Sequence, residues 1–378
     1  MKIIQETIPD RLREAVLPLL KVENSVLFDI ETTGLSHRSS HLYLIGAVSC
    51  RSRQWTLRQW FMEKPSEEAA LLQQFSAFLQ EENASALIHY NGDTFDLPYL
   101  HSKYTFYGMP DPLAGMQSQD LYRQLRPYRQ ILGLSAMKQK DIEKYAGILR
   151  EDAMTGGELI QVYRRYLRTA SPEDLSLLLL HNRDDLAGLA GILPVTAICR
   201  LFEGEFRARQ ADMPDSAPAR VQEPALKAAR ETGQDAEMIF SILPAVPLPA
   251  PLHTASAYCR VNAGNGTDDI RLTVPLLQGT LLHFFRDYKN YYYLPAEDQA
   301  IHKSVAQYVE KEYRVRATAA TCYQKVCGTF LPHPFPGTAP VFRRTFKDTE
   351  AWIRLEKGTF PDAGQLHAYV LGMLQTLL

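Results

Sequence analysis

The sequence predicts a mixed α/β domain followed by a smaller α+β domain. Between Ser25 and about Leu201, apolar runs typical of strands come first, and runs with helical spacing then alternate with them. Between about Glu203 and Leu252 the composition changes to Ala, Pro and charged residues, which indicates a linker ending in LPAVPLPAPL. A chain of 378 residues is long enough for each domain to bury its own core. The expected segments are an N-terminal domain, a linker and a C-terminal domain at 1–202, 203–252 and 253–378.

Three β-like runs begin the first domain: SVLFDI, HLYLIGAVSC and QWTLRQWFM. Short polar turns join them, which predicts an antiparallel meander. The next run, PSEEAALLQQFSAFLQ from Pro65, has acidic residues in its first turn and apolar residues at helical spacing, so we expect a helix. ALIHYNG then predicts a fourth strand that ends in a turn, and helical segments follow as far as Ile192. Among them, the cap, proline and acids of Ser171–Asp174 predict a helix start.

The second domain alternates predicted strands and helices. IRLTVPL, GTLLHFF, NYYYLP and RVRATAATCYQKV have the composition of strands. DQAIHKSVAQYVEKEY has the spacing of an amphipathic helix, and GQLHAYVLGMLQTLL that of a closing helix. Eight basic residues between Lys303 and Lys347, with NYYYLP nearby, are typical either of a surface for single-stranded nucleic acid or of a half-buried sheet with an aromatic core.

Composition narrows the class of protein. Hydrophobic residues make up 46% and charged residues 22% of the chain, as in an ordinary globular protein. The segment MKIIQETIPDRLREAVL lacks the apolar core of a signal peptide, and no uninterrupted apolar run approaches the roughly 20 residues that span a bilayer. We therefore expect a cytoplasmic protein without membrane contact. The five cysteines show neither a CxxC pair nor zinc-like spacing.

A local excess of positive charge is hidden by the net charge of −2. Residues 121–150 contain seven Lys or Arg against Asp141 and Glu143. Such a run is typical either of a phosphate-facing surface or of a solvated helix face.

The first chemical motif is VLFDIETTGL. Side chains alternate along an extended strand, so Asp29 and Glu31 project from the same face. Two carboxylates that close repel each other unless a cation lies between them, which favours a metal site. The alternative is a strand end at which Asp29 caps a loop and Glu31 is solvated.

The second motif is HYNGDTFDLPYL. The dipeptide NG ends a strand, and Asp93 or Thr94 is a plausible cap for the helix that follows. Asp96 then falls in the first helical turn, just beyond a strand end where the sites of α/β proteins gather. The helix dipole alone also favours an aspartate at this position.

The third motif, HNRDDLAGL, lies in the last predicted helix. Asp185 follows His181 by four residues and shares an apolar face with Leu178 and Leu189. Asp184 is rotated by about 100° from that face, although periodicity alone does not exclude it as the functional residue. A lone histidine in such a helix is often only a packed core residue.

Together, FDIETTG, NGDTFDLPYL and HNRDDLAGL resemble the three exonuclease motifs of the DEDD superfamily. More narrowly, residues 25 to about 195 resemble the YprB-type predicted exonucleases, which also have segments similar to SQDLYRQLR and GILREDAMTGGEL. The resemblance implies a ribonuclease-H-like fold, with a mixed five-stranded sheet flanked by helices. It also implies metal ligands at Asp29, Glu31, Asp96 and Asp185, and substrate contacts at Thr32, Gly34, Leu35, Asn91 and Phe95.

The third motif departs from the superfamily pattern. One branch has tyrosine four residues before the aspartate and the other has histidine five before it, whereas His181 stands at the tyrosine spacing. The resemblance therefore does not identify the general base. An imidazole with an ordinary pKa of about 6.5 is suited to take the proton of an attacking water at neutral pH.

The expected function is hydrolysis of phosphodiester bonds in DNA or RNA, most simply as a 3′-5′ exonuclease acting on a single-stranded end. Two Mg²⁺ or Mn²⁺ ions held by carboxylate oxygens would be its cofactors. Two alternatives are an endonuclease on the same fold, and a module that binds nucleic acid or a partner through a vestigial site. The presence of all four carboxylates argues against decay of the site.

Overall fold

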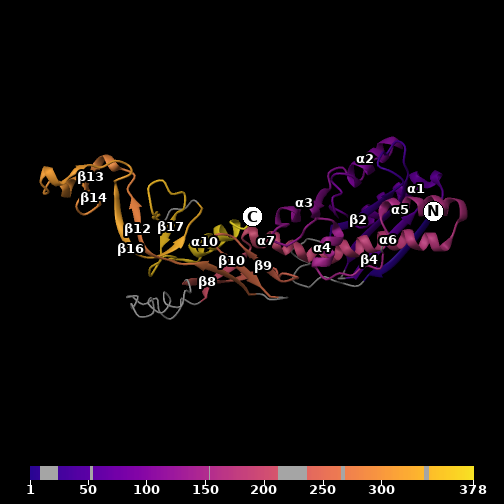
Figure 1. Ribbon diagram of the computed structural model, residues 1–378. Coiled ribbons are helices and arrows are strands. Elements are labelled where there is room, and N and C mark those ends of the chain that lie inside the picture. The colour runs from indigo at the N-terminus through magenta and orange to yellow at the C-terminus, as the bar shows by residue number, and fades with distance from the viewer. Residues whose placement is uncertain (9–23, 52–53, 153, 212–235, 265–268, 336–339) are drawn as a thin grey trace. The chain divides into compact units, whose positions relative to one another are not determined.

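The computed structural model describes residues 1–8, 24–51, 54–152, 154–211, 236–264, 269–335 and 340–378. The chain forms two compact units (Figure 1). The first contains Met1–Arg200 together with Val246–Ala250, and the second contains Leu201–Ala245 together with Pro251–Leu378.

A six-stranded mixed sheet, in the order β1-β4-β3-β2-β5-β6, is the centre of the first unit. Strands β1 to β4 pair antiparallel, which confirms the predicted meander, whereas β5 and β6 add parallel to β2. The expectation of five strands was one too few, because β1 pairs with β4 along its whole length. The bounds are β1 Lys2–Ile8, β2 Ser25–Thr32, β3 Leu42–Arg51, β4 Gln54–Phe61, β5 Ala86–His89 and β6 Gln117–Asp120.

The helices of the first unit follow the predicted order. The last long helix, α6, begins as predicted, with Pro172 at its first position and the Ser171 hydroxyl accepting a hydrogen bond from the backbone N–H of Asp174. The bounds are α1 Glu68–Glu81, α2 Asp96–Phe106, α3 Leu121–Leu125, α4 Gln139–Tyr145, α5 Gly156–Thr169, α6 Pro172–Ile192 and α7 Ala197–Glu203.

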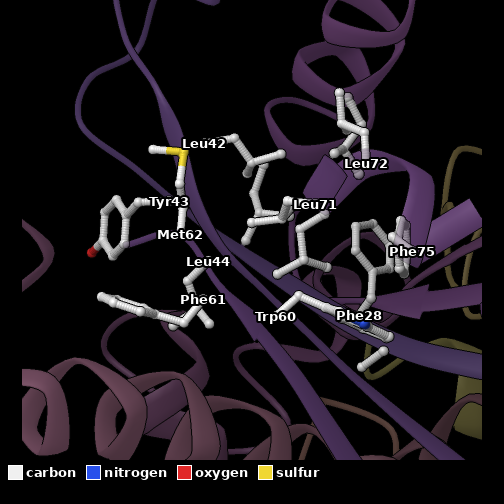
Figure 2. Close-up of a cluster of buried hydrophobic side chains, with 14 of the residues drawn as sticks. Phe28, Leu42, Tyr43, Leu44, Trp60, Phe61, Met62, Leu71, Leu72 and Phe75 are labelled. Carbon is white, nitrogen blue, oxygen red and sulfur yellow. The ribbon is translucent and has the colours of Figure 1, made fainter. Parts of the chain in front are cut away.

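The two faces of the sheet have different roles. Phe28 points to the face covered by α1, where it packs with Phe75 and belongs to a core that includes Trp60 and Leu71 (Figure 2). Asp29, its neighbour in β2, points to the opposite face, which is covered by α6. The alternation expected for VLFDIE therefore separates an apolar face from a polar one.

Glycine allows α6 to lie very close to the sheet. Gly46 on β3 is the register partner of Asp29, and a Cβ there would overlap the side chains of Asn182 and Leu186 on α6. Gly188 has the same role further along α6, since a Cβ there would overlap the carboxylate of Glu143 on α4. These two contacts fix how far α6 lies from β3 and from α4.

The stretch Pro172–Glu203, which contains α6 and α7, is long and apolar enough to cross a membrane by length and composition. The prediction that no apolar stretch approaches that length counted only uninterrupted runs. In the structure 83% of its apolar window is buried within the protein. Packing in the core therefore accounts for its hydrophobicity.

The regular secondary structure described in the second unit is mainly β-strand. A five-stranded sheet has the order β7-β8-β11-β10-β9, and two three-stranded sheets have the orders β12-β16-β17 and β14-β13-β15. The closing helix α10, Ala363–Gln375, was predicted and packs on β7. The strand bounds are β7 Phe206–Ala211, β8 Glu237–Pro244, β9 Leu252–Ala255, β10 Arg260–Ala263, β11 Ile270–Pro275, β12 Leu277–Phe284, β13 Tyr291–Leu294, β14 Gln299–His302, β15 Val315–Arg316, β16 Tyr323–Pro332 and β17 Trp352–Arg354.

Two sequence predictions for this half of the chain need correction. Part of the predicted linker 203–252 is sheet, because Met238, Phe240 and Ile242 alternate along β8 and are fully buried, while 212–235 lies outside the described residues. The helix expected over 298–313 is mostly absent. Its first residues form β14 against β13, and only Lys303–Ala306 is α-helical, so sheet pairing outweighs the helical spacing.

Candidate metal centre

Asp29 is held at the centre of the sheet by an amide from α6. Its Oδ2 accepts a hydrogen bond from Nδ2 of Asn182 at 2.9 Å. Asn182 is fully buried, and its Oδ1 in turn accepts a hydrogen bond from Nε2 of Gln59 at 2.9 Å. This chain of amides fixes the direction of the Asp29 carboxylate.

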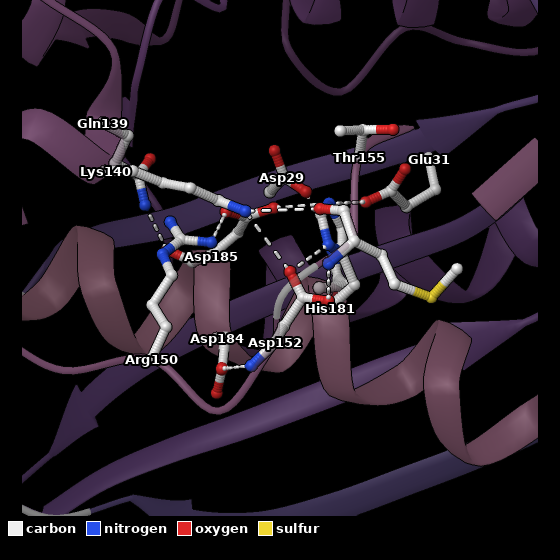
Figure 3. Close-up of polar contacts among 12 residues, drawn as sticks. Asp29, Glu31, Gln139, Lys140, Arg150, Asp152, Thr155, His181, Asp184 and Asp185 are labelled. Carbon is white, nitrogen blue, oxygen red and sulfur yellow. Dashed lines mark hydrogen bonds and ion pairs between the residues drawn. The ribbon is translucent and has the colours of Figure 1, made fainter. Parts of the chain in front are cut away.

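Glu31 lies two residues further along β2, on the same face. The hydroxyl of Tyr43 donates to its Oε2 over 3.4 Å, and Nε2 of His181 lies 3.7 Å from its Oε1. The first and third motifs therefore meet at Glu31, as Figure 3 shows.

Asp96 is the first residue of α2, the helix that follows β5. Its carboxylate accepts hydrogen bonds from its own backbone N–H and from that of Ile30. Because β5 pairs with β2 only as far as Leu27, the backbone of Ile30 lies beyond the end of that pairing. Asp96 therefore contacts the strand that carries Asp29 and Glu31.

The two aspartates of HNRDDL have different partners. Oδ2 of Asp185 lies 3.2 Å from Nε2 of His181, and its Oδ1 accepts a hydrogen bond from Nη1 of Arg150 at 2.6 Å. Oδ2 of Asp184 instead accepts hydrogen bonds from the backbone N–H groups of Glu151 and Asp152, both at 2.8 Å. Asp185 therefore lies with the other carboxylates, whereas Asp184 anchors the segment that precedes α5.

His181 is oriented by a carboxylate of its own. Its Nδ1 lies 2.7 Å from Oδ2 of Asp152, while its Nε2 faces Glu31 and Asp185 (Figure 3). Asp152 is itself within 3.4 Å of Nζ of Lys140. When Nδ1–H donates to Asp152, the lone pair of Nε2 is directed at the carboxylate cluster.

Burial and mutual repulsion make ionisation of these acids costly. Burial, followed by the charge of Asp185, raises the pKa of Asp29 well above its usual range and that of Glu31 to about 8. Burial likewise raises the pKa of Asp96 to about 7, although hydrogen bonds from the backbone oppose the shift. A cation among the carboxylates would remove most of this cost.

The donor set suits a hard divalent cation. Ligand atoms of Glu31, His181 and Asp185 all lie within 4.8 Å of one another. Asp29 and Asp96 are outside that group in the described structure, but the charge of Asp96 raises the pKa of both Asp29 and Glu31, and the charge of Glu31 also raises that of Asp29. Carboxylate oxygens dominate the cluster, which is the preference of Mg²⁺ and Mn²⁺ rather than of zinc.

The five residues expected to contact substrate lie at the ends of two neighbouring strands. Thr32 is the last residue of β2 and Gly34 and Leu35 follow it, while Asn91 and Phe95 follow β5. Since β2 and β5 are parallel neighbours, the loops after them leave the same edge of the sheet. Leu35 is 86% exposed, and Asn91 is exposed in the left-handed region with φ of 61°.

Sequence reasoning missed Asn182, Asp152, Arg150 and Glu143. Asn182 had a readable signal, because an amide stands between His181 and Asp185 in an otherwise apolar helix. Arg150 and Asp152 lie in GILREDAMTGGEL, which the resemblance marked without giving these residues a role, and Glu143 lies in α4, where no motif links it to α6.

A second group of acids and histidine, formed by His89, Asp93 and Asp120, supports a loop. The backbone N–H of Gly92 donates to Nδ1 of His89 at 3.0 Å, and that of Asn91 donates to Oδ1 of Asp120 at 2.8 Å. These atoms are thus already engaged by the backbone. The group fixes the turn that carries the chain from β5 towards Asp96.

The chain is similar in sequence to one family model and one curated protein, and it has a distant structural match. Residues 26–195 match the family model described as RNase_H superfamily. The uncharacterized protein YprB of Bacillus subtilis (strain 168) is 26% identical over 177 residues, which cover 45% of this chain and 41% of that protein. The family B DNA polymerase of the hyperthermophilic archaeon Pyrobaculum calidifontis matches with a TM-score of 0.38 and 16% identity, over 70% of this chain and 35% of the polymerase chain. The chain thus spans about two fifths of the length of its curated relative.

Proposed function

Residues 26–195 form a ribonuclease-H-like domain of the YprB type, and on this premise we propose that the protein is a 3′-5′ exonuclease that hydrolyses DNA or RNA with two divalent metal ions. The observation that carries the proposal is the meeting of all three motifs at one edge of the sheet. Glu31 from β2 and Asp185 from α6 lie on either side of His181, and Asp96 contacts the backbone of β2.

Asp29, Glu31, Asp96 and Asp185 would hold the ions. When bound, Mg²⁺ or Mn²⁺ would lower the pKa of a water and stabilise the charge of the leaving oxygen. The repulsion that raises the pKa values of Asp29 and Glu31 supports this assignment, because it is a cost that a cation offsets.

His181 would act as the general base. Its Nε2 is directed at the carboxylate cluster, and Oδ2 of Asp152 lies 2.7 Å from Nδ1, where it would accept a hydrogen bond from Nδ1–H. Proton transfer to Nε2 leaves an imidazolium that the Asp152 carboxylate stabilises. The spacing of four residues on α6 places His181 one helical turn from Asp185, so base and metal ligand share one helix face.

One experiment tests both the substrate class, DNA or RNA, and the end from which the strand is degraded. Single-stranded DNA and RNA, labelled at either the 5′ or the 3′ end, are incubated with the protein in Mn²⁺, in Mg²⁺ and in EDTA, beside a circular single strand. The proposal predicts mononucleotides released from the 3′ end in the presence of metal, and an intact circle. Cleavage of the circle would show an endonuclease, and cleavage that persists unchanged in EDTA would overturn the metal mechanism.

A further inference from the structure

A cavity of about 490 Å³ lies beside the candidate metal centre. We name it the tyrosine cavity, and its walls are Tyr90, Asn91, Tyr122, Met137, Lys138 and Gln139. Gln139 joins the two sites, because its Nε2 donates to the backbone carbonyl of Asp185 at 2.7 Å (Figure 3). The volume is within the range of about 300–1,000 Å³ typical of small-molecule sites.

Two aromatic rings form a fixed wall of the cavity. Tyr90 and Tyr122 are half-buried, with ring centroids 5.8 Å apart and an interplanar angle of 67°. The hydroxyl of Tyr90 donates to the carbonyl of Met137 at 2.6 Å, which fixes the ring and joins β5 to the segment before α4. The Tyr90 ring therefore does not need to reorder in order to present apolar surface to a flat ligand.

Polar groups complete the walls. The backbone of Asn91 is held by a hydrogen bond to Asp120 at 2.8 Å and by one from the Thr94 hydroxyl at 2.9 Å, in a left-handed conformation that is rare for residues other than glycine. This conformation leaves Asn91 exposed at the cavity, where its amide can both donate and accept. Lys138 is also exposed there and adds a positive charge.

We propose that the tyrosine cavity binds one nucleotide of the substrate strand, adjacent to the phosphodiester that is cut. The base would stack on the Tyr122 ring beside the Tyr90 ring, which is tilted by 67° and would form a side wall. The Asn91 amide would bond the edge of the base, and Lys138 would meet the phosphate. The inference rests on the proposed nuclease function and gives it a substrate-binding residue set. The proposal also places Lys138, which belongs to the basic segment 121–150, at a phosphate. A phosphate-facing surface was one of the two interpretations of that segment.

The competing explanation is that the two tyrosines only hold α4 in place. Substitutions that separate stacking from folding distinguish the two. Tyr122→Phe keeps the aromatic ring. Tyr122→Leu removes the aromatic ring but keeps an apolar side chain. Lys138→Ala removes a charge from the cavity, whereas Lys144→Ala removes the same charge from α4 outside the lining residues and serves as the matched control.

The test measures binding without cleavage. A short fluorescein-labelled oligothymidylate is titrated with the full-length protein in EDTA, and its fluorescence anisotropy is followed. Wild type, Tyr122→Phe and Lys144→Ala should bind with similar affinity. Tyr122→Leu should bind about tenfold more weakly, the usual size of one lost base–aromatic contact. Lys138→Ala should bind more weakly and with a smaller salt dependence. Circular dichroism and thermal unfolding confirm that each variant is folded.

The outcomes separate this inference from the proposed function. If the wild type cleaves nucleic acid but folded Tyr122→Leu binds the oligonucleotide as tightly as wild type, the tyrosine cavity is not a nucleotide site and the nuclease proposal stands. If oligonucleotide binding depends on Tyr122 and Lys138 but no metal supports cleavage, the cavity is supported and the nuclease proposal fails. Absence of oligonucleotide binding by the wild type at low salt would overturn the inference directly.

Discussion

Arg150 donates a hydrogen bond from Nη1 to Oδ1 of Asp185 at 2.6 Å, while Glu143 binds the remaining face of the same guanidinium. The carboxylate that α6 presents towards the core therefore has a side-chain cation as its partner, in addition to any metal ion. These contacts also raise the pKa of Arg150 above its usual value, against the effect of burial.

Removing that guanidinium should destabilise the protein strongly. Arg150→Met leaves the buried Glu143 without a cationic partner, with only the hydrogen bond from Gln139, so we expect the free energy of unfolding to fall by about 3–5 kcal/mol. The measurement is urea denaturation in EDTA. The double variant Arg150→Met, Glu143→Leu should recover much of the loss, because no buried charge then lacks a partner. Equal stability of both variants would show that packing, rather than the ion pair, determines the effect.

Stability of the metal-free protein should fall as pH rises. The folded state raises the pKa of Glu31 to about 8 and of Asp96 to about 7, and both ordinary values are near 4, so the folded state binds more protons between about pH 4 and pH 8. The stabilising effect of the protonated acids is complete below pH 4 and is lost by about pH 8. Melting temperatures in EDTA across this range check the sign, and Glu31→Gln should flatten the curve. Mn²⁺ should raise the melting temperature more at pH 8 than at pH 5, because the ions bind the ionised carboxylates.

The neighbouring aspartates of α6 should differ in what their loss affects. Asp185→Asn should abolish nearly all cleavage and change stability little. Asp184→Asn should keep most of the cleavage but cost about 1 kcal/mol of stability, because its charge assists two backbone hydrogen bonds. Cleavage rates and urea denaturation of the matched pair decide between the two roles. The reverse pattern would assign the metal to Asp184.

His181 and Asp152 should act as a pair. His181→Ala should slow cleavage by about 10²–10⁴-fold, the usual contribution of a positioned base, while metal ions still raise the melting temperature. Asp152→Asn should slow it less, because the imidazolium formed by proton transfer loses its carboxylate partner. A His181→Ala enzyme as fast as wild type would show that the histidine only packs. An Asp152→Asn enzyme as fast as wild type would show that Asp152 does not assist the base.

Gly46→Ala should disturb the candidate metal centre, although Gly46 itself has no side chain in it. At position 46 the new Cβ would overlap Asn182 and Leu186, so Gly46→Ala should cost about 1–3 kcal/mol or more and displace the amide that holds Asp29. Gly157→Ala is the control, because nothing lies within 4 Å of a Cβ there. Thermal unfolding and cleavage rates are compared. A Gly46→Ala protein with wild-type values would mean that α6 shifts without cost.

The parts of the candidate metal centre that could be predicted from the sequence are those that follow from the regular spacing of side chains along a strand or a helix. Alternation along β2 gave the shared face of Asp29 and Glu31, and the helical repeat placed Asp185 one turn from His181. The functional roles of these four residues remain predictions. The contacts made by Arg150 were beyond reach, because they depend on how closely α4 approaches α6.

The predictions of secondary structure succeeded and failed for the same reason: regular spacing within a segment can be read from the sequence, and contacts between segments cannot. Long periodic runs such as α6 and β2 to β4 are visible in one sequence because burial repeats along them. The strand β8 was hidden by the composition around it, although its alternating apolar residues were readable on their own. The predicted helix over 298–313 failed because pairing of β14 with Tyr291–Leu294 is not encoded within the segment itself.

The membership of Val246–Ala250 in the first compact unit has a consequence at the level of the gene. The first unit is discontinuous in the reading frame: its last five residues are encoded only after the first two strands of the other unit. A stop codon after Arg200 would therefore encode an incomplete unit, in which three normally buried side chains, those of Val246, Leu248 and Ala250, are missing. Expression of the first unit alone thus calls for a chain that retains residues 246–250, rather than for simple truncation after residue 200.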